Sequence, residues 1–241
     1  MTEDRALPTA ADAEATHPHF PRWNGIAPLP NARMMLHVGA ETVENFLVVG
    51  DAWGQLVAME LPAHARVLDI GCGCARTARM LLHHPQIEDY LGVDVIQPYI
   101  DWNSRFISPL TDGRFRFAHL DVRGPRYNPD GAVSAEEVAF PAADGSMTLA
   151  FAASLFTHLK EGATLRYLQE ARRVLKRGGK LIASIHDRPE GDSKFSGDEF
   201  RADVQPEYFA ALAEKNGFVL GRRVGDVCGQ ETFVFVANYF Q

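Results

Sequence analysis

The chain has 241 residues, of which 46% are hydrophobic and 23% are charged, and its formal net charge is −7. This composition is ordinary for a globular α/β protein that buries a large core without disulfides or metals. The negative charge disfavours a large nucleic-acid footprint, because phosphate binding uses clustered Lys and Arg. No apolar run approaches the roughly 20 residues that span a bilayer, and the acidic N-terminus is unlike a signal peptide. We therefore expect no nucleic-acid or membrane partner.

The three cysteines are Cys72, Cys74 and Cys228. Cys72 and Cys74 are too close in sequence for an ordinary disulfide, and the chain has no second ligand pair for zinc. The pattern predicts free thiols in a reducing, cytoplasmic setting and no metal site.

The first part of the chain, residues 1–32, has no sustained periodicity and contains five prolines. Prolines argue against a long helix, so we expect a mobile arm or an extended wrap over the core. Residues 42–61 have a helical pattern that is interrupted near Gly50. We therefore expect two parts: an N-terminal arm with covering helices at 1–61, and one α/β domain at 62–241.

After residue 62 short apolar runs alternate with amphipathic stretches. Strands are expected at 66–70, 90–93, 115–118, 147–152 and 180–185. Helices are expected at 77–83, at 98–107, and from Leu165 to a stop at Gly178 and Gly179. This alternation predicts a parallel sheet with helices on both faces.

The chain ends differently. A helix at 206–216 precedes two strands, 218–224 and 232–237, which are joined by only seven residues. That link is too short for a crossover, so the two strands must be antiparallel. The predicted fold is a doubly wound α/β fold, with a mostly parallel seven-stranded Rossmann-like sheet and an antiparallel C-terminal hairpin.

The run VLDIGCGCAR, residues 67–76, joins the first strand to the first helix. Gly71 and Gly73 allow a sharp turn and a close approach of the backbone to a ligand at the carboxyl end of the sheet. Asp94 ends the second strand, 21 residues after Gly73, where a carboxylate can bind both ribose hydroxyls of an adenosine. With Asp69 and Asp121, three carboxylates follow consecutive strands, which is costly unless a ligand supplies donors.

The adenosine belongs either to NAD or to S-adenosylmethionine. The dinucleotide-binding fingerprint has a third glycine at the position of Arg76 in this chain, so the Arg76 side chain obstructs the approach of a pyrophosphate. A charged Asp69 suits a sulfonium ligand with an ammonium group. The antiparallel C-terminal hairpin also favours S-adenosylmethionine over NAD.

The chain resembles the class I S-adenosylmethionine-dependent methyltransferases over roughly residues 62–240. The resemblance rests on VLDIGCGCAR, on Asp94, on LDV at 120–122, on 144–159 and on RVLKRGGKLIASI at 173–185. It implies S-adenosylmethionine as cofactor. It also implies cofactor contacts from eight residues: Asp69, Gly71 and Gly73 at the methionine portion, Asp94 at the ribose, Val95 at the adenine face, Asp121 and Val122 at the adenine edge, and Ser154 at the methionine side. The chain departs from the family at Ala75, where a third glycine is common, and at 147–150, where an aspartate is common.

The stretch after the fourth strand places Phe156 and His158 near the expected methyl group, and His186 ends the fifth strand. We expect all three to face the substrate. His158 is the candidate general base, since its ordinary pKa is near neutrality; a histidine that only braces this loop is the alternative. We expect a small organic acceptor, such as a natural product or a sugar-linked metabolite. A non-catalytic S-adenosylmethionine-binding protein and an NAD-dependent oxidoreductase are the alternative functions. The methylated atom and the oligomeric state are left open.

Residues 123–141 separate the third and fourth strands, and 19 residues is long for such a connection. Apolar side chains such as Tyr127 and Phe140 predict that the segment folds against the domain, with a short helical turn around Ser134 and Glu137. We expect it to shield the adenine end of the cofactor, while residues 23–47 cover the methyl end and select the acceptor. The alternative is a surface loop remote from the site.

Overall fold

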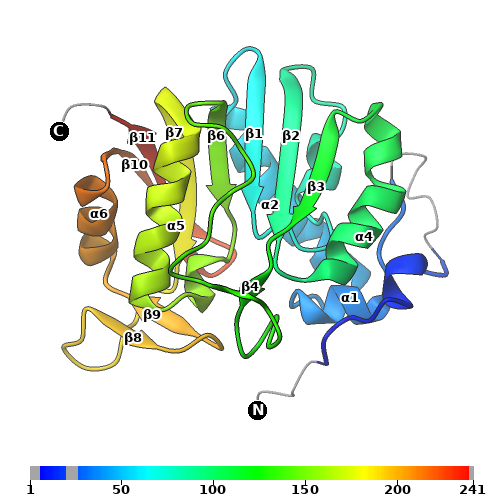
Figure 1. Ribbon diagram of the computed structural model, residues 1–241, viewed down its shortest axis with the longest axis horizontal. Helices are drawn as coiled ribbons and strands as arrows, with labels where there is room; N and C mark the ends of the chain where they lie inside the picture. The colour runs from blue at the N-terminus through cyan, green and yellow to red at the C-terminus, as the bar shows by residue number, and fades with distance from the viewer. Residues whose placement is uncertain (1–5, 20–26, 239–241) are drawn as a thin grey trace.

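The computed structural model describes residues 6–19 and 27–238, and within them seven strands form one sheet in the order β10-β11-β7-β6-β1-β2-β3 (Figure 1). The strands are β1 (Ala65–Ile70), β2 (Ile87–Asp94), β3 (Phe115–His119), β6 (Met147–Ala152), β7 (Leu175–Ile185), β10 (Phe218–Val227) and β11 (Gln230–Ala237). The first five are parallel, whereas β11 runs antiparallel to both β7 and β10. The predicted mostly parallel sheet with an antiparallel C-terminal pair is confirmed.

Helices cover both faces of the sheet (Figure 1). One face packs against α2 (Val43–Glu60), α3 (Ala78–Leu81) and α4 (Gln97–Phe106), and the other against α5 (Glu161–Val174) and α6 (Pro206–Lys215). Neighbouring residues of β1 show the division, because Val67 belongs to the first apolar cluster and Leu68 to the second. Successive strand side chains point to opposite faces, so a strand that is buried on both faces reads as one continuous apolar run.

Helix α2 runs without a break through Gly50, so the predicted interruption is wrong. A Cβ at this position would collide with the backbone carbonyl of Arg76. The glycine therefore allows α2 to approach the start of α3 closely, and the free energy of that packing outweighs the low helix propensity of glycine. The helix begins where expected, since the Thr42 hydroxyl accepts a hydrogen bond from the Asn45 amide at 3.1 Å.

The described part of the N-terminal segment wraps over the core. Ala15 accepts a hydrogen bond from Trp102 Nε1 of α4 at 3.0 Å, and Thr16 forms an isolated bridge with Pro30. A helix that we did not expect, α1 (Ala32–His37), follows at once. Asn31 caps it by accepting the Met34 amide at 3.0 Å. Of the two states predicted for this segment, the extended wrap is the one observed in the described residues.

Several boundaries differ from expectation. Helix α3 is four residues long. Helix α5 ends at Val174, and Gly178 and Gly179 lie inside β7 instead of closing the helix. The two terminal strands are longer than predicted and leave only Cys228 and Gly229 between them, both with positive φ. Two central residues of that kind form the turn type that matches the twist of a hairpin.

The connections at the carboxyl ends of the strands carry most of the additional structure, at the lower edge of the sheet in Figure 1. Residues 120–146 contain β4 (Val122–Arg123) and β5 (Val133–Ser134), which pair in parallel, and a turn follows where we expected a helical turn. Phe140 is buried and packs edge-on against Tyr167 of α5, with ring centroids 5.6 Å apart, so this segment does fold against the domain. A second, unexpected hairpin joins β8 (Phe195–Gly197) to β9 (Ala202–Val204).

Candidate functional site

A cavity of about 810 Å³ lies at the carboxyl ends of β1, β2 and β6. Its walls come from the glycine loop at 71–75 and Arg76 after it, the end of α1, the connection after β3 and the loop after β6. This volume is typical of sites for small molecules. In an open α/β sheet, the crevice outside the carboxyl ends of the strands is where ligands bind.

The glycine loop forms one wall of the cavity. Gly71 has φ of +80° and Gly73 has φ of +52°, a region that side chains with a Cβ rarely adopt. Gly71 also donates its amide to the carbonyl of Val93 at 2.8 Å, which fixes the loop to the end of β2. The sequence places glycine here because the backbone turns sharply from β1 and leaves its own surface open to the cavity.

Asp94 lies beside this loop and is 8% exposed. One carboxylate oxygen accepts the Gly73 amide at 2.8 Å, and the other accepts the Ile96 amide at 2.9 Å. Burial raises the pKa of Asp94, although these amides lower it. A carboxylate offers about four acceptor sites, so Asp94 keeps acceptor capacity for hydroxyl donors of a ligand.

Asp69, at the end of β1, is buried even more deeply, with 2% of its surface exposed. Its carboxylate accepts a hydrogen bond from the phenol of Tyr90. Burial raises the pKa of Asp69 to about 8; the Tyr90 hydrogen bond opposes this shift and the charge of Asp94 adds to it. A cation that enters the cavity would therefore stabilise the ionised form of Asp69.

Ser154 follows β6 and has φ of +60°, which is uncommon for a residue other than glycine. Two partners hold it in this conformation. The Ser154 amide donates to Ser184 Oγ at 3.0 Å, and the side-chain amide of Gln230 donates to the Ser154 hydroxyl. Ser184 also donates to Gln230 Oε1 at 2.7 Å. The start of β11, at the turn of the C-terminal hairpin, therefore supports the cavity wall.

His158 lies at another wall, edge-on to Tyr127 with ring centroids 5.5 Å apart. Burial, followed by the positive charges of Arg126 and His186, lowers the pKa of His158 to about 4. Arg126 Nη1 lies 3.4 Å from His158 Nδ1. A guanidinium only donates hydrogen bonds, so Nδ1 is the acceptor and the proton of the neutral ring is on Nε2. The imidazole is thus held neutral and oriented.

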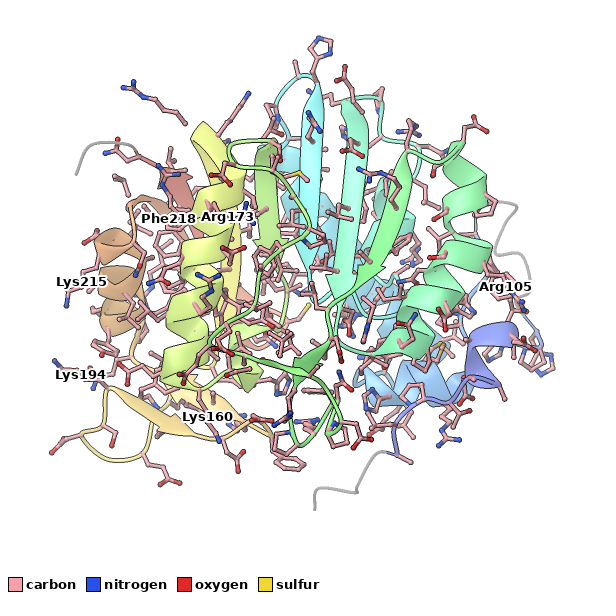
Figure 2. The ribbon with its side chains drawn as sticks, in the orientation of Figure 1. Arg105, Lys160, Arg173, Lys194, Lys215 and Phe218 are labelled. Carbon is pink, nitrogen blue, oxygen red and sulfur yellow. The ribbon has the colours of Figure 1, made fainter. Side chains whose placement is uncertain are left out.

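Arg126 also joins this wall to the β8–β9 hairpin. Its Nη1 donates to the carbonyl of Phe200 at 2.6 Å, and its guanidinium stacks over the rings of Tyr127 and Phe200. Nearby, Lys160 and Glu199 form an ion pair at 3.9 Å. Figure 2 shows Lys160 at the end of α5 that faces the β8–β9 hairpin.

Eight of the predicted site residues line the cavity: Asp69, Gly71, Gly73, Asp94, Val95, Val122, Ser154 and His158. Three others are absent from its walls. Asp121 is exposed and accepts a hydrogen bond from Asn128 at 3.3 Å. Phe156 is 1% exposed and packs against Phe209 in the core, at a ring distance of 5.1 Å. His186 is half-buried, and its backbone bridges to that of Asp203.

The sequence predictions also missed residues that line the cavity. Tyr99 of α4 and His37 of α1 form a hydrogen-bonded pair, with Nδ1 and the hydroxyl 2.6 Å apart. His37 was not predicted to line the cavity because helix α1, which carries it, was not predicted. The sequence alone identifies Arg76 only as an obstacle to a pyrophosphate, and Tyr127 only as an apolar residue of a long loop. Trp23, proposed for the cover of the methyl end, lies outside the described residues.

Two further features are absent from residues 6–19 and 27–238. No group of three or more His, Cys, Asp or Glu residues among them is arranged to hold a metal ion. In the same ranges, no helix combines the length and the apolar character needed to cross a bilayer.

Residues 68–183 match a family model described as a methyltransferase domain. Among solved structures, the chain is similar to a Burkholderia thailandensis 1,6-didemethyltoxoflavin-N1-methyltransferase with bound 1,6-didemethyltoxoflavin and S-adenosylhomocysteine (16% identity, 85% of this chain and 84% of that chain, TM-score 0.61). It is also similar to a TehB-like S-adenosylmethionine-dependent methyltransferase from Corynebacterium glutamicum (20% identity, 86% and 92%, TM-score 0.54). The [4+2]-cyclase SpnF shares the fold as well (18% identity, 78% and 80%, TM-score 0.58).

Proposed function

Because residues 68–183 match a methyltransferase domain family and the chain has the fold of S-adenosylmethionine-dependent methyltransferases, we propose that it is a class I enzyme of this kind and methylates a small organic acceptor inside the cavity described above. The predictions of a methyltransferase and of S-adenosylmethionine as its cofactor are confirmed. The acceptor class, a natural product or a sugar-linked metabolite, is the part that we propose. The observation that carries it is a small-molecule-sized cavity with buried carboxylates on one wall and mostly rings and apolar side chains on the others.

The residues of the glycine-loop wall fit the cofactor. Asp94 is buried, holds two backbone amides and keeps acceptor capacity that suits the two hydroxyls of a ribose. Asp69 is a buried carboxylate that a positive charge stabilises, and the cofactor carries a sulfonium and an ammonium. We propose that Gly71, Gly73 and Ser154 contact the methionine portion, and that Val95 and Val122 contact the adenine. The side chain of Asp121 is exposed, so we propose only that its backbone lies beside the adenine edge.

The bound cofactor supplies an activated methyl group and a good leaving group. The residues of the chain then act mainly by alignment, since holding two reactants in line supplies a large part of the rate acceleration. Asp94 and the glycine loop hold one reactant, and the loop after β6 meets the other. His158 is neutral and is oriented by Arg126, and we propose that it helps to position the acceptor on its side of the cavity.

The cavity walls beyond the glycine loop suit a small acceptor with apolar or aromatic parts, and they also carry charged side chains such as Arg126, Glu136 and Glu137. Their apolar and aromatic side chains include Tyr127, Leu155, Leu159 and Tyr167. The nearby cation Lys160 pairs with Glu199, so its charge is already balanced. We do not place Phe156 or His186 against the acceptor, because neither lines the cavity.

Two expectations stay predictions, the cytoplasmic setting and the absence of a nucleic-acid acceptor. A reducing cytoplasmic setting is compatible with the three cysteines, none of which forms a disulfide in the described residues. The net charge of −7 continues to disfavour nucleic acid as acceptor. A non-catalytic cofactor-binding protein is the main alternative, because one fold hosts unrelated chemistries.

The test has two steps. Isothermal titration should show binding of S-adenosylmethionine and S-adenosylhomocysteine without binding of NAD. Transfer of a labelled methyl group is then measured against panels of phenols, amines, glycosides and nucleic acids. Transfer to a small acceptor, lost in Asp94→Ala, supports the proposal. Cofactor binding with labelling only of nucleic acid would refute the acceptor class, and tight NAD binding without binding of S-adenosylhomocysteine would refute the function.

A further inference from the structure

Arg76 follows the glycine loop directly and contributes to the cavity wall. It is mostly buried, and burial lowers the pKa of its guanidinium. One hydrogen bond is present, from Nη1 to the carbonyl of Val38 at 3.1 Å. The close packing of Gly50 against the Arg76 backbone fixes this residue from behind.

Within the part of the chain that the structure describes, no carboxylate forms an ion pair with Arg76. Arg79, three residues further along, is different, because it pairs with Asp51 and donates to the carbonyl of Leu47 at 3.0 Å. A guanidinium has five N–H donors, and leaving a desolvated charge without a counter-ion costs free energy. Arg76 therefore has donors and a positive charge that the protein itself does not satisfy.

The other cations of the cavity wall are exposed, joined to the β8–β9 hairpin, or paired with a carboxylate. Arg123 donates from Nε to the carbonyl of Gly131 at 2.7 Å and is exposed. Arg126 bonds to the hairpin carbonyl of Phe200, and Lys160 forms its ion pair. Arg76 is thus the cavity cation that can receive an anionic group next to the glycine loop.

We infer that Arg76 binds the α-carboxylate of the amino-acid portion of the cofactor. The inference rests on the proposed function in one respect, that the cavity takes S-adenosylmethionine. The glycine loop then carries one charge on each side: Asp69 before it meets the ammonium, and Arg76 after it meets the carboxylate. Arginine suits this role because its planar fork matches a carboxylate with two parallel hydrogen bonds.

A purely structural role is the competing explanation, since Arg76 also braces the end of α1 through Val38. The two roles differ in which ligands they affect. A brace supports the whole cavity, whereas a carboxylate contact matters only for ligands that carry the amino acid. S-adenosylhomocysteine and 5′-methylthioadenosine form a suitable pair, because they share the adenosine and the thioether and only the first has the amino-acid group.

Both ligands are titrated calorimetrically into the wild type, Arg76→Gln and Arg76→Lys. Loss of the charge-assisted bonds should weaken S-adenosylhomocysteine by about 10–100-fold in Arg76→Gln. The affinity for 5′-methylthioadenosine should change by less than about 3-fold, and Arg76→Lys should lie between the wild type and Arg76→Gln. Arg79→Gln, which removes a guanidinium already paired with Asp51, is the matched control and should leave the ratio of the two affinities unchanged.

The methyl ester of S-adenosylhomocysteine removes the carboxylate charge without altering the protein. It should bind the wild type about as weakly as S-adenosylhomocysteine binds Arg76→Gln, and it should be insensitive to that substitution. Equal losses for both ligands, no loss for either, or an ester that binds the wild type as tightly as the free acid would each overturn the inference. If the wild type binds neither ligand, the cofactor assignment fails and this inference fails with it.

Discussion

The phenol of Tyr90 donates a hydrogen bond to a carboxyl oxygen of Asp69 at the buried end of β1. Burial still keeps the pKa of Asp69 at about 8, so this carboxyl is largely protonated at neutral pH in the ligand-free protein. A cationic ligand favours its ionised form. The pair thus couples the charge state of the cavity wall to the arrival of the cofactor.

The first prediction concerns stability against pH. The folded-state pKa of Asp69 lies above its unfolded value, so the native protein holds this proton more tightly between about pH 4 and pH 8. The contribution of Asp69 to the free energy of unfolding therefore falls as pH rises through this window, by at most about 1.4 kcal/mol per pH unit. Urea unfolding from pH 5 to 8.5 should show a shallower decline for Asp69→Asn than for the wild type. Parallel pH profiles for the two proteins would contradict the assignment.

The second prediction concerns the release of the Asp69 proton when a ligand binds. Binding of S-adenosylhomocysteine, which carries an ammonium, should displace the proton of Asp69, and its affinity should increase as pH rises from about 6 to about 8. Titration calorimetry in buffers of different ionisation enthalpy should record proton release near pH 7. Asp69→Asn should abolish this release. Uptake of a proton by the wild type would show that another group controls the linkage.

The third prediction tests Asp94. Asp94→Ala should weaken S-adenosylhomocysteine by about 1–3 kcal/mol, because charge-assisted hydrogen bonds to the ribose are lost. Asp89 is the matched control, since it lies on the same strand and pairs with Arg116, outside the cavity. Asp89→Ala should leave the affinity within about 3-fold of the wild type, well under the loss expected for Asp94→Ala. Equal effects of the two substitutions on affinity would remove Asp94 from the ribose.

The fourth prediction concerns His158. With a pKa of about 4 and Arg126 at its Nδ1, the imidazole is neutral and does not change protonation near pH 7. His158→Ala should therefore preserve cofactor affinity, reduce turnover by less than about 100-fold, and leave any neutral limb of the pH–rate profile in place. His186→Ala, at a histidine outside the cavity wall, serves as control. A larger loss together with disappearance of the neutral limb would establish His158 as a general base.

The sequence predicted the layers of the fold well because strands buried on both faces are mostly continuous apolar runs, as in β1, β2, β6 and the second half of β7. Local patterns failed where tertiary contacts decide. Gly50 looks like a helix breaker until its contact with Arg76 is known. Helix α1 is short and follows two prolines, so neither its periodicity nor its length gave a signal.

The candidate site divides in the same manner. Residues that belong to the glycine loop or end β2 were identified because parallel strands all end at one edge of the sheet, which makes their positions predictable. Phe156 and His186 are close to the same edge in sequence, yet the direction of a side chain after a strand depends on the loop that follows. Phe156 turns into the core against Phe209. The walls made by α1 and by the β8–β9 hairpin come from segments without a motif.

The last prediction concerns residues 123–126, the start of the segment 123–141 that we expect to shield the adenine end of the cofactor. The structure places this segment on the cavity wall, but Arg126 contacts His158 and the β8–β9 hairpin. We therefore expect this segment to cover the acceptor side as well as the adenine edge near Val122. Trypsin cleavage after Arg123 and Arg126 should slow markedly when S-adenosylhomocysteine is added, because a segment packed on a ligand opens less often. Cleavage after the exposed Arg177, in the bend of β7 and away from the cavity, is the internal control and should change only as far as the ligand raises global stability. If saturating ligand slows both sites by the same factor, the protection is global and the segment is no cover; if it slows neither, the segment is a surface loop.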